Sequence, residues 1–159
     1  MSNEDKAKTD DGVVEFSFVA FANAPFYRKI NTDLVELSNL HPGQRVVDLA
    51  CGTGGVTRII LDKLRGARES LVIGVDLSTI ALRQAREELQ SAKDAMVEFV
   101  LGRAEQLSQL VREKVDAVVF CNAIHLVTDK KRLSREVFST LRSGGVFAFN
   151  TSFYAGGHL

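Results

Sequence analysis

Short apolar runs alternate with longer amphipathic stretches along most of this chain. The runs are rich in Val, Ile and Phe, and the stretches between them carry apolar residues at helical spacing. Strand and helix in alternation predict a series of right-handed βαβ units, and therefore a parallel sheet covered by helices on both faces. The near-continuous apolar character of the runs fits such doubly covered strands. Five strands are predicted: residues 45–50, 71–76, 97–101, 115–122 and 146–150.

Helices are predicted before and between these strands. The first spans residues 23–40, with Pro25 in its first turn, where a missing backbone N–H costs nothing. Ser78 or Thr79 is a suitable N-cap for the helix after the second strand, and Thr128 or Asp129 for the helix before the fifth.

Length and charge limit the classes of protein to be considered. The chain has 159 residues, enough for about one domain. We expect residues 1–12, which are polar, to be a flexible tail and residues 13–159 to form a single domain. Twenty Lys and Arg balance twenty Asp and Glu, so the chain has no basic excess for broad electrostatic binding of nucleic acid or acidic lipid. No apolar run is long enough to span a membrane, and two cysteines are typical of a cytoplasmic protein with reduced thiols.

Ligands of open α/β sheets bind outside the carboxyl ends of the strands. There, the first predicted strand is followed by the glycine-rich stretch 52–55, which allows a ligand to approach the backbone closely. The second strand ends at Asp76, whose carboxylate can accept hydrogen bonds from both hydroxyls of a ribose. The glycine-rich stretch and Asp76 together predict a site for a nucleoside-containing cofactor. The alternative is a plain tight turn with a helix-capping acid.

The spacing of the glycines bears on which nucleoside is bound. Dinucleotide sites have the pattern G-x-G-x-x-G/A, in which the third small residue allows close packing of helix on strand. Gly52 and Gly54 match the first two positions, but Thr57 occupies the third. This weakens the dinucleotide interpretation without excluding it. A P-loop is excluded because no G-K-[ST] follows.

Several segments resemble the ordered motifs of class I S-adenosylmethionine-dependent methyltransferases. VVDLACGTGGVT at 46–57 resembles the first motif, an acid followed by G/A-x-G-x-G, with Ala50 at the first small position. Later motifs follow in order and extend the resemblance over residues 23–150: GVDLS at 74–78, GRAEQL at 102–107, VDAVVFCNAIHLV at 115–127 and LRSGGVFAFN at 141–150. The resemblance implies a doubly wound, Rossmann-like, mostly parallel sheet with strand order 3-2-1-4-5.

It also implies roles for single residues. Gly52 and Gly54 would line the methionine portion of S-adenosylmethionine, Asp76 would bind the ribose, Leu77 would pack on the adenine, and Asn122 would lie by the methionine end. Asp48 would hold the glycine loop, and Ala104 with Glu105 would lie near the adenine edge. The cofactor-binding set is thus Asp48, Ala50, Cys51, Gly52, Gly54, Asp76, Leu77, Ala104, Glu105 and Asn122.

Transfer of the methyl group is an in-line displacement, and a hydroxyl or amine acceptor benefits from a general base. His125, just past the fourth strand, is the best candidate base because histidine titrates near neutral pH. The alternative is that His125 shapes the pocket or bonds to the backbone. Cys51 and Cys121 follow strands expected to be neighbours, so their thiols could form a redox pair; the alternative is two small residues in tight loops.

The acceptor is expected to be a small molecule. Nucleic-acid amino-methylases resemble one another in an [N/D]-P-P-[Y/F] motif after the fourth strand, where this chain has Cys121 to Ile124. Catechol-type enzymes place acids for a metal there and after the next strand, where this chain has Asn122 and Asn150-Thr151. We therefore expect no nucleic-acid substrate and no catalytic metal.

The family usually has seven strands, whereas this chain stops soon after the fifth. The antiparallel pair that normally follows is expected to be missing, and a partner chain or a second copy could complete the sheet edge. Two alternatives remain open from the sequence: an NAD(P)-dependent oxidoreductase on the related dinucleotide fold, and a truncated, non-catalytic cofactor-binding module or partner subunit.

Overall fold

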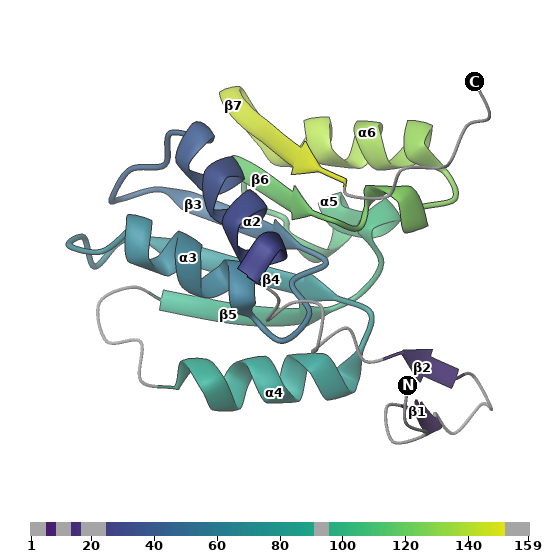
Figure 1. Ribbon diagram of the computed structural model, residues 1–159. Coiled ribbons are helices and arrows are strands. Elements are labelled where there is room, and N and C mark those ends of the chain that lie inside the picture. The colour runs from purple at the N-terminus through teal and green to yellow at the C-terminus, as the bar shows by residue number, and fades with distance from the viewer. Residues whose placement is uncertain (1–5, 9–13, 17–24, 91–95, 152–159) are drawn as a thin grey trace, which may run out of the picture.

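A computed structural model describes residues 6–8, 14–16, 25–90 and 96–151 (Figure 1). Its centre is a five-stranded parallel sheet in the order β5-β4-β3-β6-β7. Counted along the sheet-forming strands, this is the order 3-2-1-4-5 implied by the resemblance, which is confirmed. The strands are β3 (Arg45–Leu49), β4 (Leu71–Asp76), β5 (Met96–Leu101), β6 (Val115–Cys121) and β7 (Leu141–Asn150).

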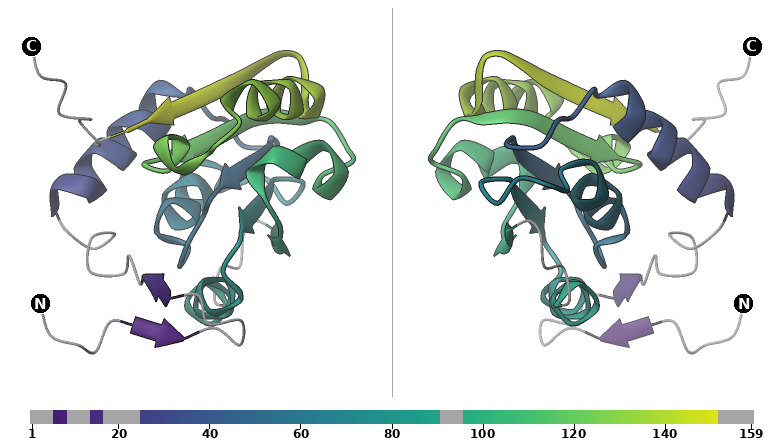
Figure 2. Two further views of the ribbon diagram at one scale, coloured as in Figure 1. Left: turned by 90° about the vertical axis from the view of Figure 1, so that its right-hand side faces the viewer. Right: turned by 90° about the vertical axis from the view of Figure 1, so that its left-hand side faces the viewer.

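Helices cover both faces of this sheet (Figure 2). Successive residues of β3 point to opposite faces: Val46 packs in the group that contains Ile60 of α3, and Val47 packs in the group that contains Leu133. The first face carries α2 (Pro25–Leu37), α3 (Gly55–Lys63) and α4 (Thr79–Leu89). The second carries η2 (Ala104–Gln106), α5 (Leu107–Leu110), η3 (Ile124–Leu126) and α6 (Lys130–Thr140).

Both predicted helix caps are present. The Ser78 hydroxyl accepts a hydrogen bond from the Ala81 N–H at the start of α4, and the Asp129 carboxylate accepts one from the Arg132 N–H at the start of α6. Each side chain satisfies a backbone donor that the helix itself leaves without a partner.

The last strand begins earlier than predicted. Residues 143–145 look like a turn, yet β7 starts at Leu141, directly after α6. Leu141 pairs with Val115, Val146 pairs with Ala117, and a register shift lies between them. A bulge therefore absorbs the glycine-rich residues within the strand instead of delaying its start.

Near the N-terminus, β1 (Lys6–Lys8) and β2 (Val14–Phe16) form a short antiparallel pair. The tail expected over residues 1–12 therefore contains a strand with a hydrogen-bonded partner, and its other residues lie outside the described part of the chain. Among the described residues, no helix is long and apolar enough to cross a membrane.

Candidate functional site

The turn after β3 is built from left-handed backbone conformations. Ala50, Gly52 and Gly54 have φ of 58°, 54° and 87°. The turn is held by hydrogen bonds from Cys51 N–H to the Val75 carbonyl (3.1 Å) and from Gly54 N–H to the Cys51 carbonyl (3.0 Å). It thus binds to the neighbouring strand β4 and closes on itself just before α3.

The two motif glycines meet different surroundings. A Cβ at Gly52 would have no atom of the protein within 4 Å, so open space lies beside this backbone. A Cβ at Gly54 would lie 2.9 Å from Leu89 Cδ1 and 3.3 Å from Ala85 Cβ, both on α4. Gly54 therefore allows α4 to pack against the turn, whereas Gly52 leaves room for a ligand.

Asp76, the last residue of β4, joins two backbone segments. Its Oδ2 accepts a hydrogen bond from Gly52 N–H (2.8 Å), and its Oδ1 accepts one from Ser78 N–H (2.9 Å). An ionised carboxylate has about four acceptor positions, so lone pairs remain on both oxygens. Asp76 is only partly buried and can therefore hold the glycine turn and still accept hydroxyl donors.

Asp48 is buried in β3 beneath the turn, and Thr57 Oγ1 donates a hydrogen bond to its Oδ2 (2.6 Å). Burial raises the pKa of Asp48 to about 7; the hydrogen bond from Thr57 opposes this shift, and the nearby Asp76 carboxylate adds to it. The contact explains why Thr57 stands where a dinucleotide site has a small residue: its hydroxyl partners a buried carboxyl.

Cys51 and Cys121 are both free thiols. Burial is the main cause that raises the pKa of each thiol well above its usual range, and the Asp48 carboxylate raises both further. Because the thiolate is the reactive form, these thiols are poorly suited to redox exchange at neutral pH. The surroundings favour the interpretation of two small residues in tight loops over the redox hypothesis.

Apolar side chains lie next to Asp76. Leu77 follows it in sequence and is 60% exposed. Leu101, which sequence reasoning missed, pairs with Asp76 across β4 and β5 and is 52% exposed. The sequence feature that could have identified Leu101 is its position at the end of a predicted apolar strand, the same position that Asp76 has in the strand before it. Ala104 and Glu105 follow in η2, where Glu105 pairs with Arg103 (3.5 Å).

Asn122 follows β6, on the other side of β3 from Asp76, and its φ is 53°. Its backbone N–H donates to Asn150 Oδ1 (2.9 Å), and its Nδ2 donates to Asn31 Oδ1 (2.8 Å). Its own Oδ1 is buried and has no hydrogen-bond partner. Sequence reasoning missed Asn31, although this residue lies one helical turn before the buried Val35.

His125 lies in η3, with Nδ1 3.1 Å from Thr151 Oγ1. Thr151 directly follows β7, so the ends of β6 and β7 place the imidazole and the hydroxyl together. Within the described ranges, no group of three or more His, Cys, Asp or Glu side chains could hold a metal ion.

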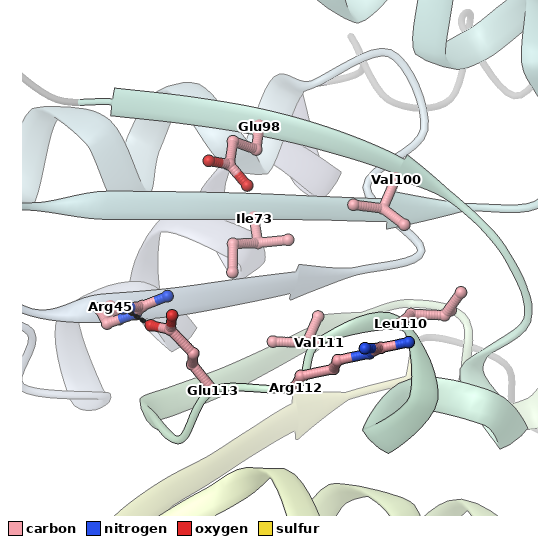
Figure 3. A pocket seen from close by; sticks show the side chains of 8 residues that line it. All are labelled: Arg45, Ile73, Glu98, Val100, Leu110, Val111, Arg112 and Glu113. Atoms are coloured by element: carbon pink, nitrogen blue, oxygen red, sulfur yellow. Dashed lines mark hydrogen bonds and ion pairs between the residues drawn. The ribbon is translucent and has the colours of Figure 1, made fainter.

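A separate cavity of about 340 Å³ lies elsewhere on the sheet (Figure 3). Its lining includes Arg45, the first residue of β3, and reaches Ile73 and Glu98 on the next two strands. Arg45 forms an ion pair with Glu113, another lining residue. Since none of the ten predicted cofactor-binding residues lines this cavity, it is distinct from the carboxyl-end site.

Comparisons with known proteins agree with this arrangement. A family model described as "Methyltransferase domain" matches residues 40–154. The probable S-adenosylmethionine-dependent methyltransferase CRG1 of Saccharomyces cerevisiae is 36% identical over 117 residues, which cover 72% of this chain and 38% of that protein. The ubiquinone/menaquinone biosynthesis C-methyltransferase UbiE of Xylella fastidiosa is 34% identical over 122 residues, with coverage of 74% and 47%. This chain thus spans less than half the length of either relative.

A solved structure is also similar: phosphoethanolamine N-methyltransferase 2 of Haemonchus contortus in complex with S-adenosyl-L-methionine. The TM-score is 0.62 at 27% identity, and the match covers 74% of this chain and 27% of that one. The methyltransferase model matches well over half of the chain, and the sheet has the strand order implied by the sequence motifs. We conclude that this chain belongs to the class I S-adenosylmethionine-dependent methyltransferase family.

Proposed function

We propose that the chain binds S-adenosylmethionine across the carboxyl ends of β4, β3 and β6 and serves methyl transfer to a small-molecule acceptor. The observation that carries this proposal is the position of the Asp76 carboxylate. It bridges Gly52 and Ser78 and keeps acceptor capacity at a partly exposed edge.

The described residues fit the chemical parts of this cofactor. Open space beside Gly52 suits the close approach of a ligand to the backbone. Asp76 supplies acceptors for the two ribose hydroxyls. Leu77 and Leu101 supply exposed apolar surface for a flat base. Asn122 supplies a buried acceptor without a partner on the opposite side of β3.

The remaining predicted residues take supporting roles in this proposal. Asp48 holds the turn through Thr57 at the start of α3. Ala50 and Cys51 form the part of the turn that binds to β4. Ala104 and Glu105, in η2 after β5, lie near the adenine edge.

S-adenosylmethionine supplies a methyl group already activated by its sulfonium. The main task of the chain is therefore to position donor and acceptor. For a hydroxyl or amine acceptor, His125 is the proposed general base, and Thr151 restrains its ring through Nδ1. A role of His125 in shaping the pocket is the alternative.

A small-molecule acceptor is supported by the zero net charge and by the names of the relatives. Those names include a C-methyltransferase and an N-methyltransferase, so the proposal does not extend to the acceptor atom.

We also propose that residues 13–159 form one cytoplasmic domain. Its β7 edge, where Val146 and Phe149 are exposed, would be covered by a partner chain or a second copy.

The test is calorimetric titration of S-adenosylhomocysteine into this chain, with NAD as the control ligand. The proposal predicts saturable binding of S-adenosylhomocysteine and none of NAD. Binding of NAD alone would overturn it in favour of a dinucleotide site. A folded chain that binds neither ligand would also overturn it.

A further inference from the structure

Three asparagine side chains meet where α2 crosses the carboxyl ends of β6 and β7. Asn31 Oδ1 accepts hydrogen bonds from Asn122 Nδ2 (2.8 Å) and from Asn150 Nδ2 (3.3 Å). Asn150 Nδ2 also lies 3.4 Å from the Ile30 carbonyl. One side-chain oxygen on α2 thus connects two residues that lie 91 and 119 positions further along the chain.

The cluster restrains Asn122 in both its backbone and its side chain. The backbone N–H of Asn122 donates to Asn150 Oδ1. The backbone of Asn122 is in the left-handed conformation, which asparagine tolerates better than most residues. The amide group is held at Nδ2 by Asn31. With Nδ2 held, the position of Oδ1 on the same planar amide is set as well.

The cluster lacks one donor. The side-chain amides of Asn122 and Asn150 both donate to Asn31 Oδ1, whereas Asn122 Oδ1 is buried with no partner. Buried side-chain acceptors without a donor are uncommon, and each calls for an explanation. The position of this acceptor supplies one: Asn122 follows β6, which neighbours β3, and Asp76 ends β4 on the other side. In the proposed binding mode, a ligand whose ribose lies at Asp76 extends across β3 towards Asn122.

We propose that Asn31 is a positioning residue for the amino-acid end of the cofactor. By holding Asn122 Nδ2, it presents Asn122 Oδ1 to a protonated amine of the ligand. This inference rests on the proposed function. It concerns the ammonium group because that group is the hydrogen-bond donor at the end of the molecule remote from the ribose and the base.

Two probes isolate this contact. S-adenosylhomocysteine carries the amino-acid end, and 5′-methylthioadenosine has the same adenosine and a thioether but lacks the ammonium and the carboxylate. Calorimetry gives the affinity of each probe for the unaltered chain, Asn31→Leu and Asn31→Asp. Leucine has a similar size and no acceptor, whereas aspartate keeps an oxygen that can accept from Asn122. Lys29→Ala, on the exposed side of α2, is the control.

We expect Asn31→Leu to weaken S-adenosylhomocysteine binding about tenfold, as for one hydrogen bond to a charged group, and to leave methylthioadenosine within about twofold. Asn31→Asp and Lys29→Ala should keep the preference of the unaltered chain. If Asn31→Leu does not give a cooperative thermal melt, Asn31→Ser replaces it, because serine is polar and its shorter side chain withdraws the acceptor from Asn122.

The outcomes separate the two proposals. Equal weakening of both probes would show that Asn31 supports the site only in general, and unchanged binding of both would show that it has no role; either result overturns the inference alone. Failure of the unaltered, folded chain to bind either probe overturns the proposed function, and the inference with it.

Discussion

The Asp76 carboxylate and the Gly52 backbone N–H are joined by a hydrogen bond of 2.8 Å. This contact connects the end of β4 to the turn after β3, so the two motifs singled out in the sequence form one unit. The second carboxylate oxygen binds Ser78 N–H before α4. The residue expected to bind the ribose therefore also positions the backbone around it.

Replacement of Asp76 by Ala should weaken S-adenosylhomocysteine binding by about a hundredfold, because the ligand loses a charged acceptor and the turn loses its hydrogen bond to β4 at Gly52. Isothermal calorimetry measures the change. Asp62→Ala is the control, because Asp62 is in an exposed ion pair with Arg65. An Asp76→Ala variant that is folded and binds as tightly as the unaltered chain would contradict the placement of the ribose.

The stability of the chain should depend on pH through Asp48. Its pKa is raised in the folded state from 3.8 to about 7, so the folded state holds the proton over a range where the unfolded state has released it. The contribution of Asp48 is therefore fully present below about pH 4 and is lost as the pH rises to about 7. At about 1.4 kcal/mol per pKa unit, the loss reaches up to about 4 kcal/mol.

Asp48→Asn is the matched variant for this effect, because an amide oxygen can still accept from Thr57. Urea unfolding at several values between pH 4.5 and 8 should show the unaltered chain losing stability relative to Asp48→Asn as the pH rises. Parallel curves for the two proteins would show that Asp48 titrates normally.

Thr57→Val should destabilise the fold by about 1–3 kcal/mol. Valine keeps the shape of threonine but removes the hydroxyl that donates to the buried Asp48 carboxyl. Chemical denaturation measures the difference. The comparison is Thr32→Val, because the exposed Thr32 hydroxyl donates to the Arg28 carbonyl of its own helix and its loss should cost much less. Equal effects at the two positions would contradict the importance of the Asp48 contact.

The two glycines of the turn should respond differently to alanine. At Gly54, the added Cβ would lie within 2.9 Å of Leu89 on α4, and the backbone φ is 87°, so Gly54→Ala should cost about 1–3 kcal/mol of unfolding free energy. At Gly52, the space is open and only the left-handed conformation is strained, which costs about 1–2 kcal/mol.

Gly52→Ala should instead weaken ligand binding more strongly than Gly54→Ala, because its methyl group enters the open space beside the turn. Thermal melts and calorimetry on both variants compare stability with affinity. The reverse order of affinities would mean that Gly52 does not face the ligand.

The strand order implied by the resemblance is confirmed. The helix caps Ser78 and Asp129 were predicted from local pattern, because a cap depends on residues a few positions apart. The start of β7 was predicted late. Residues 143–145 have the composition of a turn, but pairing of Leu141 with Val115 extends the strand across them as a bulge. Local composition does not contain that long-range pairing.

The sequence by itself determined the alternation of strands and helices, and it placed the glycine turn and Asp76 at strand ends, because apolar periodicity and glycine act over a few residues. Only the tertiary structure decided that Thr57 partners Asp48, that Gly54 makes room for α4, and that Asn31 reaches Asn122. Each of these contacts joins separate elements through the packing of side chains. Such packing depends on how the whole sheet and its helices assemble, and no short stretch of sequence records it.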